Sequence, residues 1–173
     1  MKPNGSVYVA VVFAILVGYF GYQWWYNPAR AVKRRLGEVA AALSASANDT
    51  DMTRIKRLAQ LRRYLADDIR VRPGITAPEI TSRDVVLAAI GRWRPPPGGG
   101  DIQFADVHIA MESDSAARAY VTVELTVPDR ETGRPTIDAH DATASLAKRN
   151  GEWVITAAES KELPEAEGRR QSP

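Results

Sequence analysis

The stretch KRNGEWVI, residues 148–155, decides the fold of this chain. Its Asn150-Gly151 dipeptide readily takes positive φ and is a favoured centre for a two-residue β-hairpin turn. The flanking segments, residues 137–148 and 152–159, are therefore predicted to be the two strands of an antiparallel hairpin.

Two further strands are predicted upstream of this hairpin, over residues 104–111 and 118–127. Both alternate between apolar and polar residues, as expected for antiparallel strands with one buried face. In the first, the expected core-facing residues are Ala105, Val107, Ile109 and Met111, with Phe104, Asp106 and His108 on the other face. Residues 129–135 form the turn before the final hairpin, so we expect about four strands.

Helical spacing of apolar residues replaces this alternation before residue 95. It predicts one helix over residues 29–46, a second from about residue 51 to near Asp67, and a third from Thr81 or Ser82 to Trp93. The sequence PPPGGG, residues 95–100, ends the third helix. Three helices followed by strands indicate an α+β fold in which helices cover one face of a curved antiparallel sheet.

Two segments resemble the nuclear transport factor 2-like superfamily, also called SnoaL-like or cystatin-like. They are LADDIRVRPG, residues 65–74, and the KRNGEWVI hairpin. The resemblance implies a cone-shaped domain with an internal pocket over residues 28–163, followed by a disordered tail at 164–173. The superfamily includes isomerases, dehydratases, transport adaptors and membrane-anchored assembly proteins, so the resemblance leaves the activity open.

The resemblance also suggests where catalytic residues would lie. Members similar to ketosteroid isomerase carry a general-base Asp immediately before the proline of this motif, but Arg72 stands there, and a guanidinium cannot abstract a proton. The remaining catalytic candidates are His140 with a carboxylate such as Asp68 and an orienting hydroxyl from Tyr64. Trp93, Trp153 and His140 are candidates to line a pocket for a small hydrophobic ligand.

The composition favours some ligands and partners over others. The chain has no Cys and only two His, which argues against a metal site, and it lacks a phosphate-binding glycine loop, so we expect no cofactor. Residues 28–72 carry eleven Lys or Arg against five Asp or Glu. Tyr64 is the sole aromatic residue between Pro28 and Thr81, a pattern that argues against nucleic acid and favours lipid headgroups.

The uncharged run at residues 7–26 predicts a membrane-spanning helix behind a short tail at residues 1–6. Twenty helical residues would cross the ~30 Å hydrocarbon layer. Bulky aromatics follow the apolar core where a signal peptide would carry small residues, so we expect an uncleaved anchor. The residues expected at the membrane interface are Trp24, Trp25, Tyr26, Arg30, Lys33, Arg34 and Arg35.

The expected location is the cell (inner) membrane, with a single span. Four cations after the span against Lys2 before it favour a cytoplasmic domain, whereas the layout is that of an exported domain, and we favour the extracytoplasmic side. We expect a non-catalytic module that binds a ligand, a protein partner or a second copy of itself. The alternatives are a membrane-bound isomerase or dehydratase using His140, and a membrane-surface sensor acting through residues 33–35.

Overall fold

The computed structural model describes residues 12–17, 27–46, 48–74, 77–94, 98–129 and 132–161. Its helices are α2 (Pro28–Leu43), α3 (Asp51–Tyr64) and α4 (Arg83–Arg92). Its strands are β1 (Ala45–Ser46), β2 (Leu65–Arg72), β3 (Gly99–Ser113), β4 (Ala116–Pro128), β5 (Pro135–Arg149) and β6 (Glu152–Lys161).

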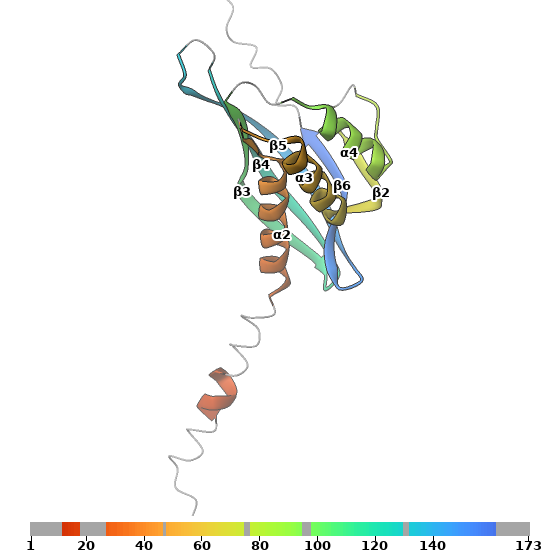
Figure 1. Cartoon of the computed structure of the whole chain (residues 1–173). Helices are drawn as coiled ribbons and strands as arrows, with labels where there is room; N and C mark the ends of the chain where they lie inside the picture. The colour runs from red at the N-terminus through yellow and green to blue at the C-terminus, as the bar shows by residue number, and fades with distance from the viewer. Residues whose placement is uncertain are drawn as a thin grey trace, which may run out of the picture.

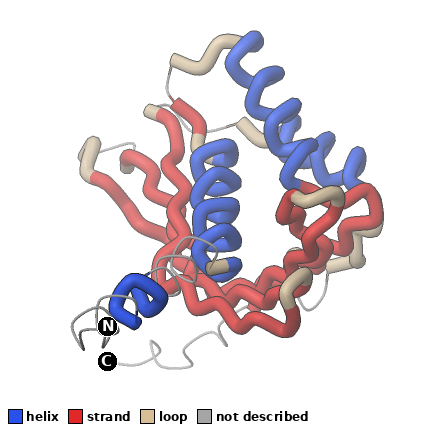
Figure 2. The backbone as a smooth tube through the Cα atoms, turned by 90° about the horizontal axis from the view of Figure 1, so that it is seen from below, coloured by secondary structure: helices blue, strands red, loops and turns tan. Residues whose placement is uncertain are grey.

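The six strands form one sheet in the order β1-β3-β4-β5-β6-β2. All neighbouring strands are antiparallel except β2 and β6, which run parallel. The sheet curves, with α2 and α3 against its concave face and α4 beside β2 (Figure 1). Seen from below, the strands form an arc around α2 (Figure 2). The predicted α+β fold with helices on one face of a curved sheet is confirmed.

The hairpin predicted from KRNGEWVI is present. Asn150 has φ 52° and Gly151 has φ 85°, the positive pair that a tight hairpin turn between β5 and β6 requires. Lys148 pairs with Trp153 and Arg149 with Glu152 across the turn. A local backbone preference therefore fixes the register of the last two strands.

Side-chain caps explain where two helices begin. The Asn27 side chain accepts a hydrogen bond from the Ala29 backbone at the start of α2, and Thr50 accepts one from Thr53 at the start of α3. The predicted stripe of α2 is buried at Val32, Leu36 and Val39. These residues direct α2 onto the sheet.

The predicted strand count and two helix ends were wrong. The first helix ends at Leu43, and residues 45–46 pair with Gly99 and Gly100 as β1. The second helix ends at Tyr64, because the following residues pair with β6 as β2. Ile69, which continues the helical spacing of the apolar residues, is buried as a residue of this strand. Pairing with residues 87 to 90 positions further along the chain outweighs the local helical spacing.

A β-bulge in β3 also alters the predicted faces. Asp106 has φ 46°, and the β3–β4 register shifts between Ala105 and His108. Phe104 consequently pairs with Val123 and packs against the core, whereas Ala105 pairs with Thr122. The bulge moves Phe104 to the face that we predicted for Ala105.

Large apolar side chains fill the space between helices and sheet. Leu36, Leu61, Ile69 and Leu146 are the largest side chains that are essentially inaccessible to solvent, and Trp153 is 5% exposed. Small residues of β4, Ala117 and Ala119, lie beneath them in the same cluster. The centre of the described domain is thus packed with side chains.

Residues 12–17 are helical and exposed. Among the segments that the structure describes, no helix combines the length and apolar character needed to cross a bilayer. The rest of the predicted span, with Trp24, Trp25 and Tyr26, lies outside the described residues, as does the predicted tail at 164–173.

Candidate functional site

A groove of about 980 Å³ lies between α2, α3 and the tip of the β5–β6 hairpin. We call it the helix–hairpin groove. Helices α2 and α3 supply its walls, and the hairpin closes one end. Its lining residues are Ala31, Arg34, Arg35, Glu38, Lys56, Ala59, Gln60, Arg63, Tyr64, Lys148, Gly151, Glu152 and Trp153.

Arg35 holds the hairpin against α2. Its guanidinium donates to Glu38 at 2.9 Å and to Glu152 across the groove, and it lies 4.6 Å from the centroid of the Tyr64 ring. The Tyr64 hydroxyl is bonded to the Gln60 amide at 2.7 Å. Through Arg35, α2 contacts both Tyr64 of α3 and Glu152 of the hairpin.

The two aromatic residues of the groove are rigidly placed. Tyr64 is 7% exposed and Trp153 is 5% exposed, and both belong to the hydrophobic core. Both also line the groove, so its floor is continuous with the packed interior. Sequence analysis assigned Trp153 to a ligand pocket and Tyr64 to catalysis, and the groove brings these two residues together.

Four cationic side chains surround this floor without a carboxylate partner. Arg34, Lys56, Arg63 and Lys148 are exposed, and within the described segments none of them makes an ion pair. The two carboxylates of the groove, Glu38 and Glu152, both bind Arg35. The groove therefore presents uncompensated positive charge above an aromatic floor.

This set of residues suits binding better than acid–base catalysis. The lining contains no His, Cys, Asp, Ser or Thr, and both Glu side chains are already bonded to a cation. Guanidinium and ammonium groups bind oxyanions through charge-assisted hydrogen bonds. An anionic ligand is the chemistry that this arrangement accepts most readily.

His140 lies elsewhere, near the start of β5. Its side chain is 53% exposed, and Nε2 lies 3.1 Å from Asp138 Oδ1. It shares the inner face with Ala144 and Leu146, as predicted, but β5 extends beyond the helices, so this part of the inner face meets solvent. The contact with Asp138 is an ion pair when the imidazole is protonated.

The other two catalytic candidates lie near the opposite end of β5. Asp68 accepts hydrogen bonds from Arg149 at 2.7 and 3.0 Å, and these bonds hold the pKa of its carboxyl below its usual range. Arg149 is nine residues from His140, about 30 Å along an extended strand. The structure therefore does not bring His140 together with Asp68.

Arg72, which replaces the general base of the related motif, has a structural role. Its guanidinium binds Glu159 of β6 at 3.2 Å and approaches Glu79 at 4.0 Å. The first contact reinforces the pairing of β2 with β6. The residue thus crosslinks the sheet edge.

Trp93 lines a separate hollow. It lies with Leu58, Leu61 and Ile90 in a space of about 220 Å³ between α2, α3 and α4. A third hollow of about 570 Å³ lies at residues 98–101 and the start of the β4–β5 hairpin. Neither is lined by Trp153 or His140, so the three predicted pocket residues do not share one site.

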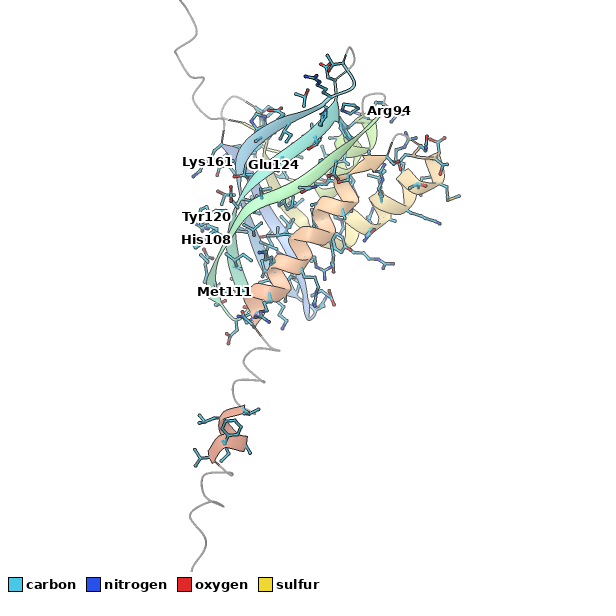
Figure 3. The ribbon with its side chains drawn as sticks, turned by 90° about the vertical axis from the view of Figure 1, so that its left-hand side faces the viewer. Arg94, His108, Met111, Tyr120, Glu124 and Lys161 are labelled. Carbon is cyan, nitrogen blue, oxygen red and sulfur yellow. The ribbon has the colours of Figure 1, made fainter. Side chains whose placement is uncertain are left out.

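The convex face of the sheet is a possible surface for the predicted protein partner or homodimer. His108 and Tyr120 pair across β3 and β4 with ring centroids 6.4 Å apart. Figure 3 shows these side chains and Glu124 on the side of the sheet away from the helices. Nothing covers them in the described chain, and a partner for this face remains a prediction.

The site residues predicted from the sequence do not include Lys56, Arg63 or Lys148. Lys56, Ala59, Gln60 and Arg63 recur at spacings of three and four, so they share one face of α3. That spacing is a usable signal for a basic helix face. This basic face lies beside Arg34 and Lys148 because α2, α3 and the hairpin pack together. No local sequence pattern predicts that packing.

A metal site has no support among the segments that the structure describes. No group of three or more His, Cys, Asp or Glu side chains is placed to hold a metal ion there. His108 and His140 lie on different strands, and His140 contacts Asp138 alone among carboxylates.

No protein-family model matches the sequence, and no curated protein matches it. Solved structures do share its fold. A putative scytalone dehydratase from Novosphingobium aromaticivorans is 18% identical, with a TM-score of 0.59 over 79% of this chain and 84% of that chain. An NTF2-like protein of unknown function from Pseudomonas putida is 15% identical, with a TM-score of 0.57 over 80% and 89%.

A protein of unknown function with a cystatin-like fold, from Nostoc punctiforme, is 12% identical, with a TM-score of 0.55 over 79% of this chain and 92% of that chain. At these identities the comparison defines the fold alone. The described domain has the nuclear transport factor 2-like, or cystatin-like, α+β fold.

Proposed function

We propose that this chain is a membrane-tethered, non-catalytic module that binds a ligand or partner through the helix–hairpin groove. The observation that carries the proposal is the contrast between a packed interior and an open, charged groove. Leu36, Leu146 and Trp153 occupy the space in which an internal substrate pocket would lie. A ligand or partner would therefore bind at the surface, where the groove is the largest of the three hollows described above.

The enzymatic alternative has less support. It requires His140, a carboxylate such as Asp68 and the Tyr64 hydroxyl to converge on one substrate atom. His140 is instead exposed beside Asp138, Asp68 is bonded to Arg149, and Tyr64 is bonded to Gln60. One structural neighbour is named as a putative dehydratase. At 18% identity that likeness concerns the fold, and it identifies no catalytic residue in this chain.

The tether rests on the sequence of residues 7–26. Helix α2 begins at Pro28, two residues after the predicted span, and Arg34 follows six residues later. At 1.5 Å per helical residue, Arg34 lies about 9 Å from the start of α2. The groove would therefore lie close to the membrane surface.

The test is to obstruct the groove without disturbing the core. Ala59 is exposed on α3 and lines the groove, so Ala59→Trp would fill it, whereas Ala88→Trp places the same side chain on the exposed face of α4. Native mass spectrometry of the full chain purified from membranes should show a bound species with the wild type and Ala88→Trp but not with Ala59→Trp. Equal retention by both variants, or no bound species at all, would refute the proposal.

A further inference from the structure

The charge of the helix–hairpin groove is unbalanced in a specific way. Its lining contains five cationic side chains and two carboxylates. Both carboxylates, Glu38 and Glu152, bind the same cation, Arg35. Four cations therefore converge on one hollow with no protein anion to neutralise them.

Exposed arginines without an ion pair also occur elsewhere in the described segments, at Arg70, Arg92 and Arg94, but the groove gathers four unpaired cations around one hollow. Four other exposed arginines outside the groove do have a carboxylate within ion-pairing distance: Arg62, Arg72, Arg118 and Arg149. Clustering like charges opposes folding, and the effect grows as the charges approach one another. An anion bound among Arg34, Lys56 and Arg63 would relieve that repulsion.

The cationic groups are presented from three separate elements. Arg34 projects from α2, Arg63 from α3 and Lys148 from the end of β5. Leu36 of α2, Tyr64 of α3 and Trp153 of the hairpin are buried in one core cluster, which holds the three elements in place, so the approach of these groups does not depend on the ligand. Preorganised donors bind an anion with less ordering cost than mobile ones.

The number and type of donors indicate the class of anion. A single carboxylate neutralises one cation and has two acceptor oxygens. A phosphate monoester carries up to two negative charges and three terminal oxygens, which suit two guanidinium forks and two ammonium groups better. The floor formed by Tyr64 and Trp153 adds an aromatic surface on which a less polar part of the same ligand can lie.

We propose that the helix–hairpin groove binds a phosphate group through Arg34, Lys56, Arg63 and Lys148. This inference rests on the proposed binding function and names the chemistry of the ligand. Two sources share the chemistry of a phosphate monoester, namely the headgroup of phosphatidic acid and a soluble phosphate monoester. The predicted span two residues before α2 would place the groove within reach of lipid headgroups.

The experiment is isothermal titration calorimetry of the full chain in uncharged detergent micelles, with the heat of protein-free micelles subtracted. The probes are dihexanoyl phosphatidic acid, the net-neutral dihexanoyl phosphatidylcholine, and glycerol 1-phosphate. The test variants are Lys56→Gln and Arg63→Gln. Matched controls are Lys161→Gln and Arg94→Gln, whose side chains lie far from the hairpin tip at the opposite end of the sheet (Figure 3).

We expect at least one of the two anionic probes to bind the wild type and the controls alike. Each test variant should weaken that binding by about tenfold, the order expected for losing one charge-assisted hydrogen bond. Binding of phosphatidic acid alone would identify a lipid headgroup, whereas equal binding of glycerol 1-phosphate would identify a soluble ester. Thermal unfolding of every variant checks that the fold is retained.

The phosphate inference is overturned if neither anionic probe binds, if the neutral lipid binds equally well, or if the controls weaken binding as much as the test variants. Those results concern phosphate alone. The Ala59→Trp test decides separately whether the groove binds a ligand or partner at all. If Ala59→Trp removes the retained species while Lys56→Gln and Arg63→Gln keep it, the groove binds something other than phosphate. If Ala59→Trp also keeps it, the proposed function fails as well.

Discussion

At the scale of single residues, neighbouring arginines of α2 have different tasks. Arg35 is 16% exposed, bonds Glu38 and Glu152, and lies over the Tyr64 ring. Arg34 is exposed and makes no ion pair in the part of the chain that the structure describes. The first shapes the helix–hairpin groove, and the second is exposed in it, where we propose that it contacts the ligand.

This difference predicts different costs for the same substitution. Arg35→Ala should lower the free energy of unfolding by about 1–2 kcal/mol, because it removes a cation–π contact and a partly buried ion pair. The bond to Glu152 adds little, since that carboxylate side chain is 69% exposed. Arg34→Ala should cost less than about 0.5 kcal/mol. Urea denaturation of the full chain measures both, and equal losses would contradict the assignment.

Asp68 provides a pH-dependent test of the contact between β2 and β5. The hydrogen bonds from Arg149 lower the folded-state pKa of Asp68, so this bond stabilises the fold above the unfolded-state pKa of about 4. That stabilisation is lost as the pH falls through the lowered pKa. The stability difference between the wild type and Asp68→Asn should therefore be constant from pH 7 to about 5 and vanish at lower pH.

Thermal denaturation across this range measures that difference. The effect is expected to be small because both side chains are exposed to solvent. Asp84→Asn is a suitable control, since it removes a single contact with Arg62 at 3.1 Å in place of the paired hydrogen bonds that Asp68 accepts. A difference that grows on acidification would have the wrong sign.

At the scale of elements, α2 and α4 each contain a glycine in a helical position. A Cβ added at Gly37 of α2 would meet no atom within 4 Å, whereas one at Gly91 of α4 would lie 3.3 Å from Leu58 Cδ1. Gly37→Ala should therefore raise the free energy of unfolding by about 0.5–1 kcal/mol. Gly91→Ala should gain less, because Leu58 must move. Chemical denaturation compares the two, and a larger gain at Gly91 would contradict the packing described here.

Elements with local signals were predictable from sequence. Asn150-Gly151 specifies its own turn, and the alternation through β4 needs only one buried face. Strand β2 was not predictable, because Leu65 and Ile69 fit helical spacing equally well and only pairing with β6 makes them a strand. The bulge at Asp106 was not predictable either, because residues 104–111 alternate without interruption in sequence.

The candidate site was predictable in its parts but not as a unit. Arg34 and Arg35 were selected as membrane-interface residues, Tyr64 as a catalytic hydroxyl and Trp153 as a pocket residue. Packing of α2, α3 and the hairpin joins all four in one groove. Periodicity describes a face of one element, and it carries no information about which faces of different elements meet.

At the scale of the whole molecule, the sheet is longer than the helix layer that covers it. Residues 135–141 of β5 are all exposed, and the β4–β5 hairpin extends past the ends of α2 and α3 (Figure 1). His140 lies on this extension, so its inward parity does not place it in the core. The opposite end carries the β5–β6 tip, the start of α2 and the helix–hairpin groove. The molecule thus has one end suited to binding anions, next to its predicted membrane span.

The uncharged run at residues 7–26 predicts that the molecule is tethered to a membrane. The full chain should remain in the membrane fraction after a carbonate wash, because an uncharged helix at residues 7–26 would cross the hydrocarbon layer. A variant lacking residues 7–26 should move to the soluble fraction with its fold intact. Release of the full chain by carbonate would contradict the tether.

Orientation decides which molecules can reach the groove, and reporters fused after Pro173 can determine it. The four cations that follow the span favour the cytoplasm, whereas we expect the reporter that is active only outside the cytoplasm to give the signal, as for an exported domain behind a signal anchor. Replacing Lys33 and Arg34 with Gln should then strengthen the external signal, because it removes charges that oppose export. A signal from the cytoplasm-only reporter would contradict this side and would restrict the phosphate proposed for the groove to cytoplasmic esters or inner-leaflet headgroups.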